Sequence, residues 1–153
     1  MSPTFAEAIP NMLRHAGKWE GVYRHVARDF TLIDEHRMST TCEFPTEGAF
    51  AYIQSDRLEW ADGRIETRSF GGVFRDGMLH WDTDRFSGTG WETHHGIVML
   101  RLDRKDVADG SSGAYFTEMI ELSADGDSRA RTWQWFEGGE PVRRTLCDEW
   151  RVG

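Results

Sequence analysis

The chain is poor in cysteine, has no long apolar run and carries fewer basic than acidic residues. Its 153 residues include two cysteines, Cys42 and Cys147. Their spacing does not indicate a disulfide framework, so we expect two reduced, half-buried thiols. No run approaches the roughly 20 apolar residues with which a helix crosses a bilayer. The first residues lack the basic segment and apolar block of a secretory signal, and we therefore expect a cytoplasmic protein.

The charge balance and the missing motifs exclude further classes. The chain carries 26 acidic and 18 basic residues, a formal net charge of −8. Nucleic acids and anionic membranes are recognised by basic surfaces, so neither is expected as a partner. There is no Gly-x-Ser-x-Gly nucleophile elbow, no glycine-rich phosphate loop that opens a helix, and no zinc-type spacing of Cys and His. We therefore expect no cofactor and no metal.

What the sequence does have is a regular alternation of aromatic-rich runs and turn signals. Dipeptides such as Asp62-Gly63, Asp76-Gly77 and Asp125-Gly126 recur at intervals of roughly a dozen residues. A further turn is expected around Gly88 and Gly90, and a flexible loop over 109–113. Between these signals, alternating patterns predict strands over 18–26, 30–44 (one strand, or two joined near Asp34), 49–60, 64–74, 78–86, 96–103, 114–123, 129–137 and 142–152.

Such a meander hides its edges by closing into a barrel or by stacking two sheets. A closed barrel of about 8 to 10 strands has room inside for one small ligand. We predict an all-β protein, one antiparallel up-and-down barrel domain over residues 1–153. Residues 1–17 carry the helical pattern, with Ser2 as the cap, Pro3 at the first helical position and Pro10 as a break. We expect this segment to plug one end of the barrel.

A resemblance supports the barrel. The first predicted strand opens with Gly17-Lys-Trp19-Glu-Gly-Val-Tyr23. This segment resembles the Gly-x-Trp opening shared by lipocalins and other calycin barrels. The resemblance implies that Trp19 closes the base of the barrel beneath a basic residue of the last strand, either Arg151 or Arg144.

The last third of the chain extends the resemblance. It contains Arg129-Ala-Arg-Thr-Trp133-Gln and Arg143-Arg-Thr-Leu-Cys-Asp-Glu149. These segments are similar to uncharacterised bacterial lipocalin-like proteins related to the phycobilin-lyase calycins. The resemblance implies a calycin fold and a ligand cavity, and it carries no catalytic residue to this chain.

Nineteen aromatic side chains, seven of them Trp, can fill a core or line a ligand pocket. On strand 129–137, placing Trp133 inside brings Arg131 inside as well. A buried arginine needs a carboxylate, and Glu118 or Asp148 can supply it. An arginine–glutamate pair beneath tryptophan suits an acidic or phenolic ligand. In the opposite register Thr132, Gln134 and Phe136 face inward, because a one-residue shift inverts every position.

Other candidates come from separate strands. His80 shares a face with Asp82 and Asp84, which is compatible with a general base or with a solvated surface. Tyr52 is a candidate second proton donor. Tyr23 and His25 follow Trp19 on the inward face of the first strand and are candidate ligand contacts. Arg144 is expected to hold an anionic group together with Arg131.

These patterns favour a barrel that binds one small aromatic or polyketide-like molecule. It either only binds, or also isomerises, dehydrates, cyclises or decarboxylates that molecule by cofactor-free acid–base chemistry, with His80, Tyr52 and Glu118 as catalytic groups. The alternative is a haem or tetrapyrrole binder with His25, His94 or His95 as the axial ligand. A third alternative is an interaction module with a filled core. The oligomeric state stays open, a homodimer included.

Overall fold

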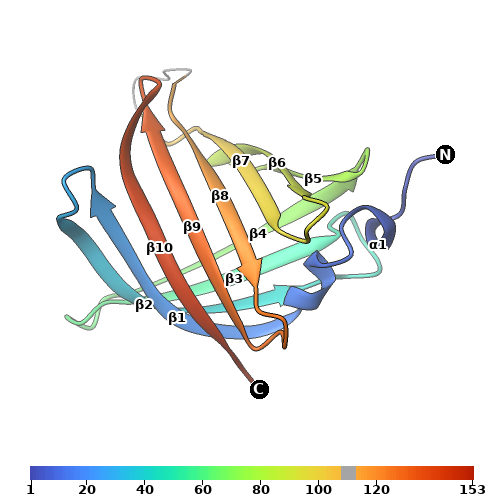
Figure 1. Cartoon of the computed structure of the whole chain (residues 1–153), viewed down its shortest axis with the longest axis horizontal. Coiled ribbons are helices and arrows are strands. Elements are labelled where there is room, and N and C mark those ends of the chain that lie inside the picture. The colour runs from blue at the N-terminus through green and yellow to red at the C-terminus, as the bar shows by residue number, and fades with distance from the viewer. Residues whose placement is uncertain (108–112) are drawn as a thin grey trace.

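The structure, a computed structural model, describes residues 1–107 and 113–153, so most of the loop expected at 109–113 falls outside the described residues. The described residues form ten antiparallel strands in one closed barrel, each strand pairing with its neighbours in sequence and the last strand closing on the first. Figure 1 shows the strands around a common interior, with the N-terminal helix beside one end. The predicted all-β barrel with a short N-terminal helical segment is confirmed.

The elements in chain order are α1 (Phe5–Ala8), the 3-10 helix η1 (Met12–His15), β1 (Gly17–Ala27), β2 (Leu32–Glu43), β3 (Tyr52–Glu59), β4 (Ile65–Arg75), β5 (Met78–Asp82), β6 (Phe86–Glu92), β7 (Val98–Arg104), β8 (Tyr115–Leu122), β9 (Ser128–Glu137) and β10 (Glu140–Val152). No helix among the described residues is long and apolar enough to cross a membrane.

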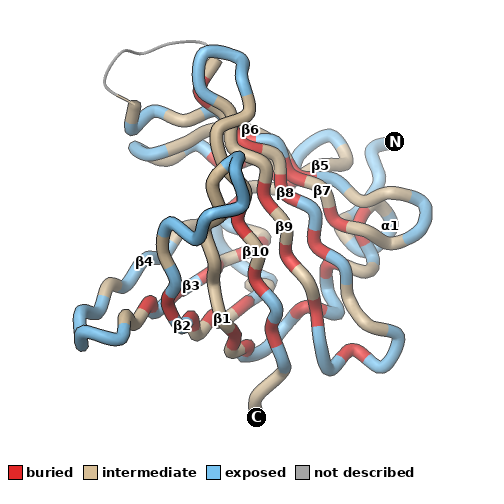
Figure 2. Tube along the Cα trace, turned by 60° about the vertical axis from the view of Figure 1, so that its left-hand side comes forward, coloured by how far each residue is buried: buried red, intermediate tan, exposed pale blue. Residues whose placement is uncertain are grey.

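Buried and exposed positions alternate along the strands, as Figure 2 shows for β8, β9 and β10. On β9, Arg129, Arg131 and Trp133 are buried, whereas the residues between them are partly exposed. This is the period of two expected when one face of a sheet meets a core. The register of β9 is therefore the one that brings Arg131 and Trp133 inside together.

The N-terminal segment lies at the base of the barrel. The helix is capped by Thr4 and not by Ser2: the Thr4 hydroxyl accepts a hydrogen bond from the Glu7 amide at 3.3 Å, and the Glu7 carboxylate accepts one from the Thr4 amide at 2.8 Å. The reason is that the helix begins at Phe5, which puts Glu7 at the position that completes a capping box with Thr4. As expected, α1 ends before Pro10.

Trp19 closes the base. Its side chain is 0% exposed, and its indole N–H donates to the carbonyl of His15 at 2.9 Å. The guanidinium carbons of Arg151 and Arg129 lie 4.4 and 4.5 Å from the ring centroid, within the range of cation–π contacts. The prediction of a C-terminal arginine over Trp19 is confirmed for Arg151. Arg144 is excluded from that role because its position on β10 faces outward.

The turn expected at Gly88 and Gly90 is wrong, because both residues lie within β6. A Cβ atom on Gly88 would lie 2.1 Å from the carbonyl oxygen of Arg101, and one on Gly90 would lie 2.8 Å from the Trp81 ring. These glycines allow the close approach of a neighbouring strand and of a core side chain. The segment expected as one strand over 78–86 is accordingly β5 followed by a turn, and β6 is the additional strand.

Candidate functional site

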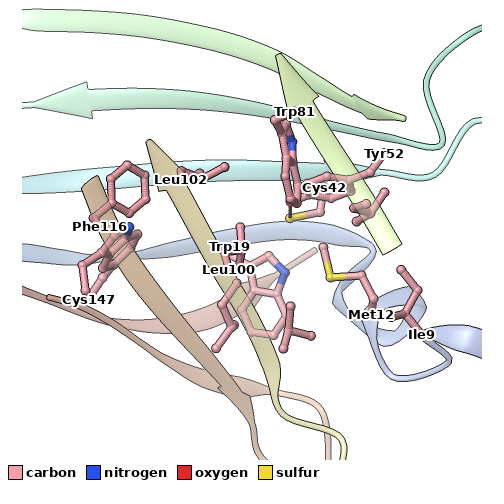
Figure 3. Close-up of a cluster of buried hydrophobic side chains, with 14 residues drawn as sticks. Ile9, Met12, Trp19, Cys42, Tyr52, Trp81, Leu100, Leu102, Phe116 and Cys147 are labelled. Atoms are coloured by element: carbon pink, nitrogen blue, oxygen red, sulfur yellow. Dashed lines mark hydrogen bonds between the residues drawn. The ribbon is translucent and has the colours of Figure 1, made fainter. Parts of the chain in front are cut away.

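The barrel encloses a cavity of about 110 Å³. Side chains from β1 to β9 and one residue of η1 face it. The lining consists of Met12, Tyr23, Met38, Tyr52, Gln54, Asp56, Leu58, Arg68, Phe70, Trp81, Arg85, Phe86, Leu100, Leu102, Phe116, Glu118, Ile120, Arg131, Trp133 and Trp135. The N-terminal segment therefore closes the cavity through Met12. Figure 3 shows Met12 and Ile9 reaching the same apolar cluster as Trp19, Tyr52 and Trp81.

Aromatic rings form much of the wall and hold one another in place. The ring centroids of Phe70 and Phe86 lie 5.3 Å apart in an edge-to-face arrangement. Phe116 packs at 6.4 Å from Phe86 and at 4.6 Å from Trp135. Tilted and edge-to-face contacts at these distances are the favoured geometries for aromatic pairs. The wall is thus a rigid apolar surface suited to a flat ligand.

Five buried polar side chains from β3, β8 and β9 line the cavity, Tyr52, Gln54, Asp56, Glu118 and Arg131, here called the inner polar cluster. The Tyr52 hydroxyl lies 2.9 Å from Gln54 Oε1, and the Gln54 amide donates to both carboxylate oxygens of Asp56 at 3.0 Å. The Thr40 hydroxyl also donates to Asp56, at 2.9 Å. Burial nevertheless raises the pKa of Asp56, and it outweighs both the charge of Arg131 and these hydrogen bonds, which lower it.

Two members of the cluster, Arg131 and Glu118, belong to a buried network of two arginines and two glutamates that also includes Arg129 and Glu149. Arg131 Nε donates to Glu118 at 2.9 Å, and Arg131 Nη1 lies 3.5 Å from Glu149. Glu149 also accepts from Arg129 Nε at 3.0 Å. Burial raises the pKa of Glu118, with Arg131 opposing the rise. Burial likewise disfavours the charge on Arg131, but Glu118 and Glu149 outweigh it and raise the pKa of Arg131.

Two lining residues, Arg68 and Arg85, are exposed and mark the opening of the cavity. The strand pairing is short in this part of the barrel, because β4 pairs with β5 only over its last three residues, Val73 to Arg75. The charged residues of the lining are then three arginines and two acids. Arg68 pairs with Glu66 at 2.9 Å, whereas Arg85 has no ion-pair partner among the described residues, so Arg85 is the cation that can attract an anion to the opening.

Five of the predicted site residues do line the cavity: Tyr23, Tyr52, Glu118, Arg131 and Trp133. Arg131 lies over the Trp133 ring at 4.6 Å, and its partner is Glu118, as the sequence pattern indicated. Asp148, the other candidate partner, is exposed on the outer face of β10.

His80 is not part of the cavity, so its predicted convergence with Arg131 is wrong. On β5 the buried positions are Leu79 and Trp81, and His80 lies on the other face. Its Nε2 donates to the carbonyl of Arg75 at 3.0 Å, and its Nδ1 lies 3.2 Å from the same arginine's guanidinium. The large apolar side chains Leu79 and Trp81 occupy the inner face of β5, so His80 lies on the outer face, as the solvated-surface interpretation requires.

Arg144 is also misplaced by the prediction. The inner face of β10 carries Thr145, Cys147 and Glu149, which leaves Arg144 outside, with its guanidinium 5.6 Å from the Phe30 ring. The same alternation buries Cys147 completely on β10. Cys147 and Cys42 are free, at 0% and 1% exposure, and not half-buried as expected.

His25 faces inward but lies toward the open end, outside the cavity lining. Its Nδ1 is 2.7 Å from the Thr145 hydroxyl, which accepts from the indole N–H of Trp135 at 2.7 Å. The pKa of His25 is lowered to about 4, mainly by burial and secondly by the positive charge of Arg143.

The sequence shows no zinc-type spacing, but the fold brings together three side chains of the kinds that can hold a metal ion. One ligand atom each from His25, Asp34 and His36 lies within 4.8 Å of the others. The three residues are separated in sequence but meet across the β1–β2 pair, where His25 is opposite Asp34. His94 and His95 lie together in the β6–β7 turn and not on a strand, with ring centroids 3.8 Å apart.

Sequence reasoning did not propose Gln54 and Asp56 as site residues. The alternation of β3 nevertheless places both on the same inner face as Tyr52. A polar residue every second position on an otherwise buried strand face was the signal that could have found them. Arg129 and Glu149 follow the same rule on β9 and β10.

No family model and no curated protein matches the chain. Solved structures do. An S-type phycobiliprotein lyase, CpeS from Guillardia theta, superposes with a TM-score of 0.71 at 16% identity, over 99% of both chains. Rv2717c from M. tuberculosis gives 0.65 at 16% identity, over 98% of this chain and 100% of that one.

A DUF3598-family protein of unknown function from Nostoc punctiforme gives a TM-score of 0.65 at 19% identity, over 92% of this chain. The chain spans about half of that protein's length, 49%. The fold is that of a calycin barrel. The resemblance to calycins related to the phycobilin lyases is thus confirmed at the level of fold.

Proposed function

We propose that this calycin barrel binds one small aromatic molecule that carries an anionic or phenolic oxygen. The observation that carries the proposal is a cavity with aromatic walls that ends on the buried Arg131–Glu118 pair, whose side chains are each 5% exposed. Apolar walls with a few convergent polar groups are the usual composition of a small-molecule site.

The size of the cavity limits the ligand. Its volume is about 110 Å³. An engineered apolar cavity of about 150 Å³ accepts benzene, whereas pockets for drug-sized ligands measure roughly 300–1,000 Å³. The cavity is therefore no larger than one that accepts a single ring, and a tetrapyrrole exceeds it.

The charges of the lining favour an oxygen anion or a phenol. Arg85 stands at the opening, beside the paired Arg68 and Glu66, and attracts a negatively charged ligand. Inside, Arg131 stays charged and can donate to an anionic oxygen, and burial raises the pKa of Asp56, which shifts that carboxyl group towards its protonated form. A protonated carboxyl donates a hydrogen bond to an anionic or phenolic oxygen.

The same groups define the acid–base chemistry open to this site. With His80 outside, Asp56, Glu118 and Tyr52 are the titratable candidates that face a bound ligand, beside Tyr23. A carboxyl group with a raised pKa is better suited to donate a proton than an ordinary one. We therefore assign any proton transfer to Asp56 and Glu118.

Tetrapyrrole binding is the second candidate. It is favoured by the fold likeness to the phycobiliprotein lyase and by the rings at the open end, where Tyr23 stacks on His36 at 4.7 Å and Trp60 lies 4.6 Å beyond. Because a tetrapyrrole exceeds the volume of the cavity, this candidate requires the ligand to lie across the open end. Absorption spectra with added haemin and biliverdin test this candidate. Unchanged spectra of both pigments would remove it.

The main proposal is tested by calorimetric titration with benzoate, phenol and the neutral analogue benzamide. We expect benzoate and phenol to bind more tightly than benzamide. Arg131→Ala should weaken benzoate binding by roughly 2 kcal/mol, about 30-fold in Kd, because it removes a buried charged partner.

Two further variants allow the test to be interpreted if Arg131→Ala folds poorly. Arg85→Ala alters an exposed position and should weaken benzoate binding in low salt, while His80→Ala, outside the cavity, should leave binding unchanged. Equal binding of benzoate and benzamide by all variants, or no binding at all, would contradict the proposal.

A further inference from the structure

We propose that His25, Asp34 and His36 form a site for a divalent first-row transition-metal ion such as Zn²⁺ at the open end of the barrel. The set consists of two imidazoles and one carboxylate. Such a set is used for zinc and for non-haem iron, and it leaves at least one coordination position for water or a ligand. The proposal does not rest on the cavity's function.

The position of the three residues follows from the β1–β2 register. His25 on β1 is directly opposite Asp34 on β2, and His36 lies two residues further along β2, opposite Tyr23. Alternation puts all three side chains on the inner face. A register shift between His25 and Val26 marks the same place, and such irregularities re-aim side chains at functional positions.

The distances are close to those a metal requires. One nitrogen from each imidazole and one Asp34 oxygen lie within 4.8 Å of one another. Ligand atoms around a tetrahedral zinc ion with bonds near 2.0–2.1 Å are about 3.3 Å apart. Small side-chain rotations can close this difference, since the residues belong to two directly paired strands.

Neighbouring groups already orient each ligand as they do in metal sites. His36 Nδ1 lies 3.1 Å from the backbone carbonyl of Arg37, which only accepts, so Nδ1 carries the proton and the Nε2 lone pair is free. His25 Nδ1 is held by the Thr145 hydroxyl at 2.7 Å. A histidine that binds a metal through one nitrogen commonly donates its other ring N–H to a carbonyl or hydroxyl oxygen.

The carboxylate is held in the same way. The Trp60 indole N–H lies 3.0 Å from both oxygens of Asp34, and the Trp60 ring packs against His36 with centroids 4.6 Å apart. A carboxylate accepts several bonds, so the indole leaves lone pairs for a cation. His36 itself is 4% exposed and stacks on Tyr23, which fixes its ring plane.

Metal binding is measured on the whole chain with Zn²⁺ by calorimetry and with Co²⁺ by visible absorption, which reports coordination geometry. We expect one Zn²⁺ per chain and a cobalt spectrum of a four- or five-coordinate ion. His25→Gln and Asp34→Asn should each weaken Zn²⁺ binding at least tenfold. Both residues are only partly buried, and unchanged melting temperatures would show that the variants are folded.

The adjacent pair His94 and His95 supplies the matched control, because exposed neighbouring histidines also take up metal. The double variant His94→Ala/His95→Ala should keep the stoichiometric Zn²⁺ site. Uptake that disappears in this double variant, or that survives both His25→Gln and Asp34→Asn, would overturn the proposal. Absence of Zn²⁺ and Co²⁺ uptake by the unaltered chain would overturn it as well.

Discussion

Arg129 joins three features of the barrel base in one side chain. Its guanidinium lies over Trp19, pairs with Glu149 and donates from Nη1 to His15 Nδ1 at 3.1 Å. Because a guanidinium can only donate, His15 Nδ1 must offer its lone pair, and the proton of the neutral ring sits on Nε2. Among the described residues His15 Nε2 is one of two buried side-chain atoms without a hydrogen-bond partner. His15 is thus fixed in one neutral tautomer.

This environment makes the stability of the fold depend on pH through His15. Burial, followed by the charges of Arg129 and Arg131, lowers the pKa of His15 to about 3. An unfolded histidine takes up its proton near pH 6.5, so the unfolded chain binds a proton in this window that the folded chain does not. The free energy of unfolding should therefore fall as the pH drops from about 6.5 towards 3, by up to about 1.4 kcal/mol per unit from this residue.

The variant His15→Gln isolates the effect. Asp56 and Glu118 have raised pKa values, and their contribution to stability has the opposite sign, falling as the pH rises. Only the difference between the chain and its variant is therefore informative. Urea denaturation at pH 7.5, 6.0 and 5.0 should show that lowering the pH costs the unaltered chain more stability than it costs His15→Gln. Identical pH dependence of the two proteins would show that His15 does not stay neutral.

For single residues, the sequence predicted correctly those positions that the alternation of inner and outer side chains along a strand determines. Arg131 was placed beside Glu118 because one strand face carried both tryptophan and arginine, and the neighbouring strand offered a buried carboxylate. His80 shows the limit. Leu79 and Trp81 already formed the more apolar face of that strand, but the acid–base interpretation of His80 favoured the other face. Burial of apolar area decides the register, and a candidate catalytic residue does not.

Strand β6 shows a similar limit at the scale of elements. Two glycines separated by one residue indicate a turn in sequence, yet Gly88 and Gly90 lie in the middle of a strand. Glycine serves both purposes, and the difference depends on what lies across from it. Here the neighbours are the backbone of β7 and the Trp81 ring, which no local pattern reveals. The β1–β2 pair is a second example, because His25 and Asp34 become neighbours only through its register.

The contact at Gly88 gives a prediction with an unusual sign. Replacing a strand glycine by alanine normally stabilises, by roughly 0.5–1 kcal/mol. A Cβ on Gly88 would lie 2.1 Å from the backbone oxygen of Arg101, so β6 and β7 must move apart. Gly88→Ala should therefore destabilise the fold by about 1–3 kcal/mol, the usual cost of overpacking.

Chemical denaturation measures this effect, with Ser87→Ala on the same strand as the control. The control should change stability by no more than about 0.5 kcal/mol, because Ser87 is a partly exposed position. A Gly88→Ala variant as stable as the unaltered chain would show that β6 and β7 are not so closely packed.

For the whole molecule, the charge of the cavity lining differs from that of the chain as a whole. The chain has a net charge of −8, yet the cavity lining holds three arginines and two acids. The closed meander and its N-terminal segment were predictable, because local turns and alternation specify each step of an up-and-down barrel. The volume of the cavity was not, since it depends on how some twenty side chains from nine strands and the N-terminal segment pack together.

The central claim is that the cavity is the ligand site, and the seven tryptophans provide the most direct test. Their indole N–H resonances can be followed by NMR during titration with benzoate. We predict that the signals of Trp81, Trp133 and Trp135, which line the cavity, shift with benzoate. Those of Trp91 and Trp150, 36% and 44% exposed on the outside, should stay in place. Shifts confined to Trp91 and Trp150, or no shift at saturating benzoate, would contradict the account.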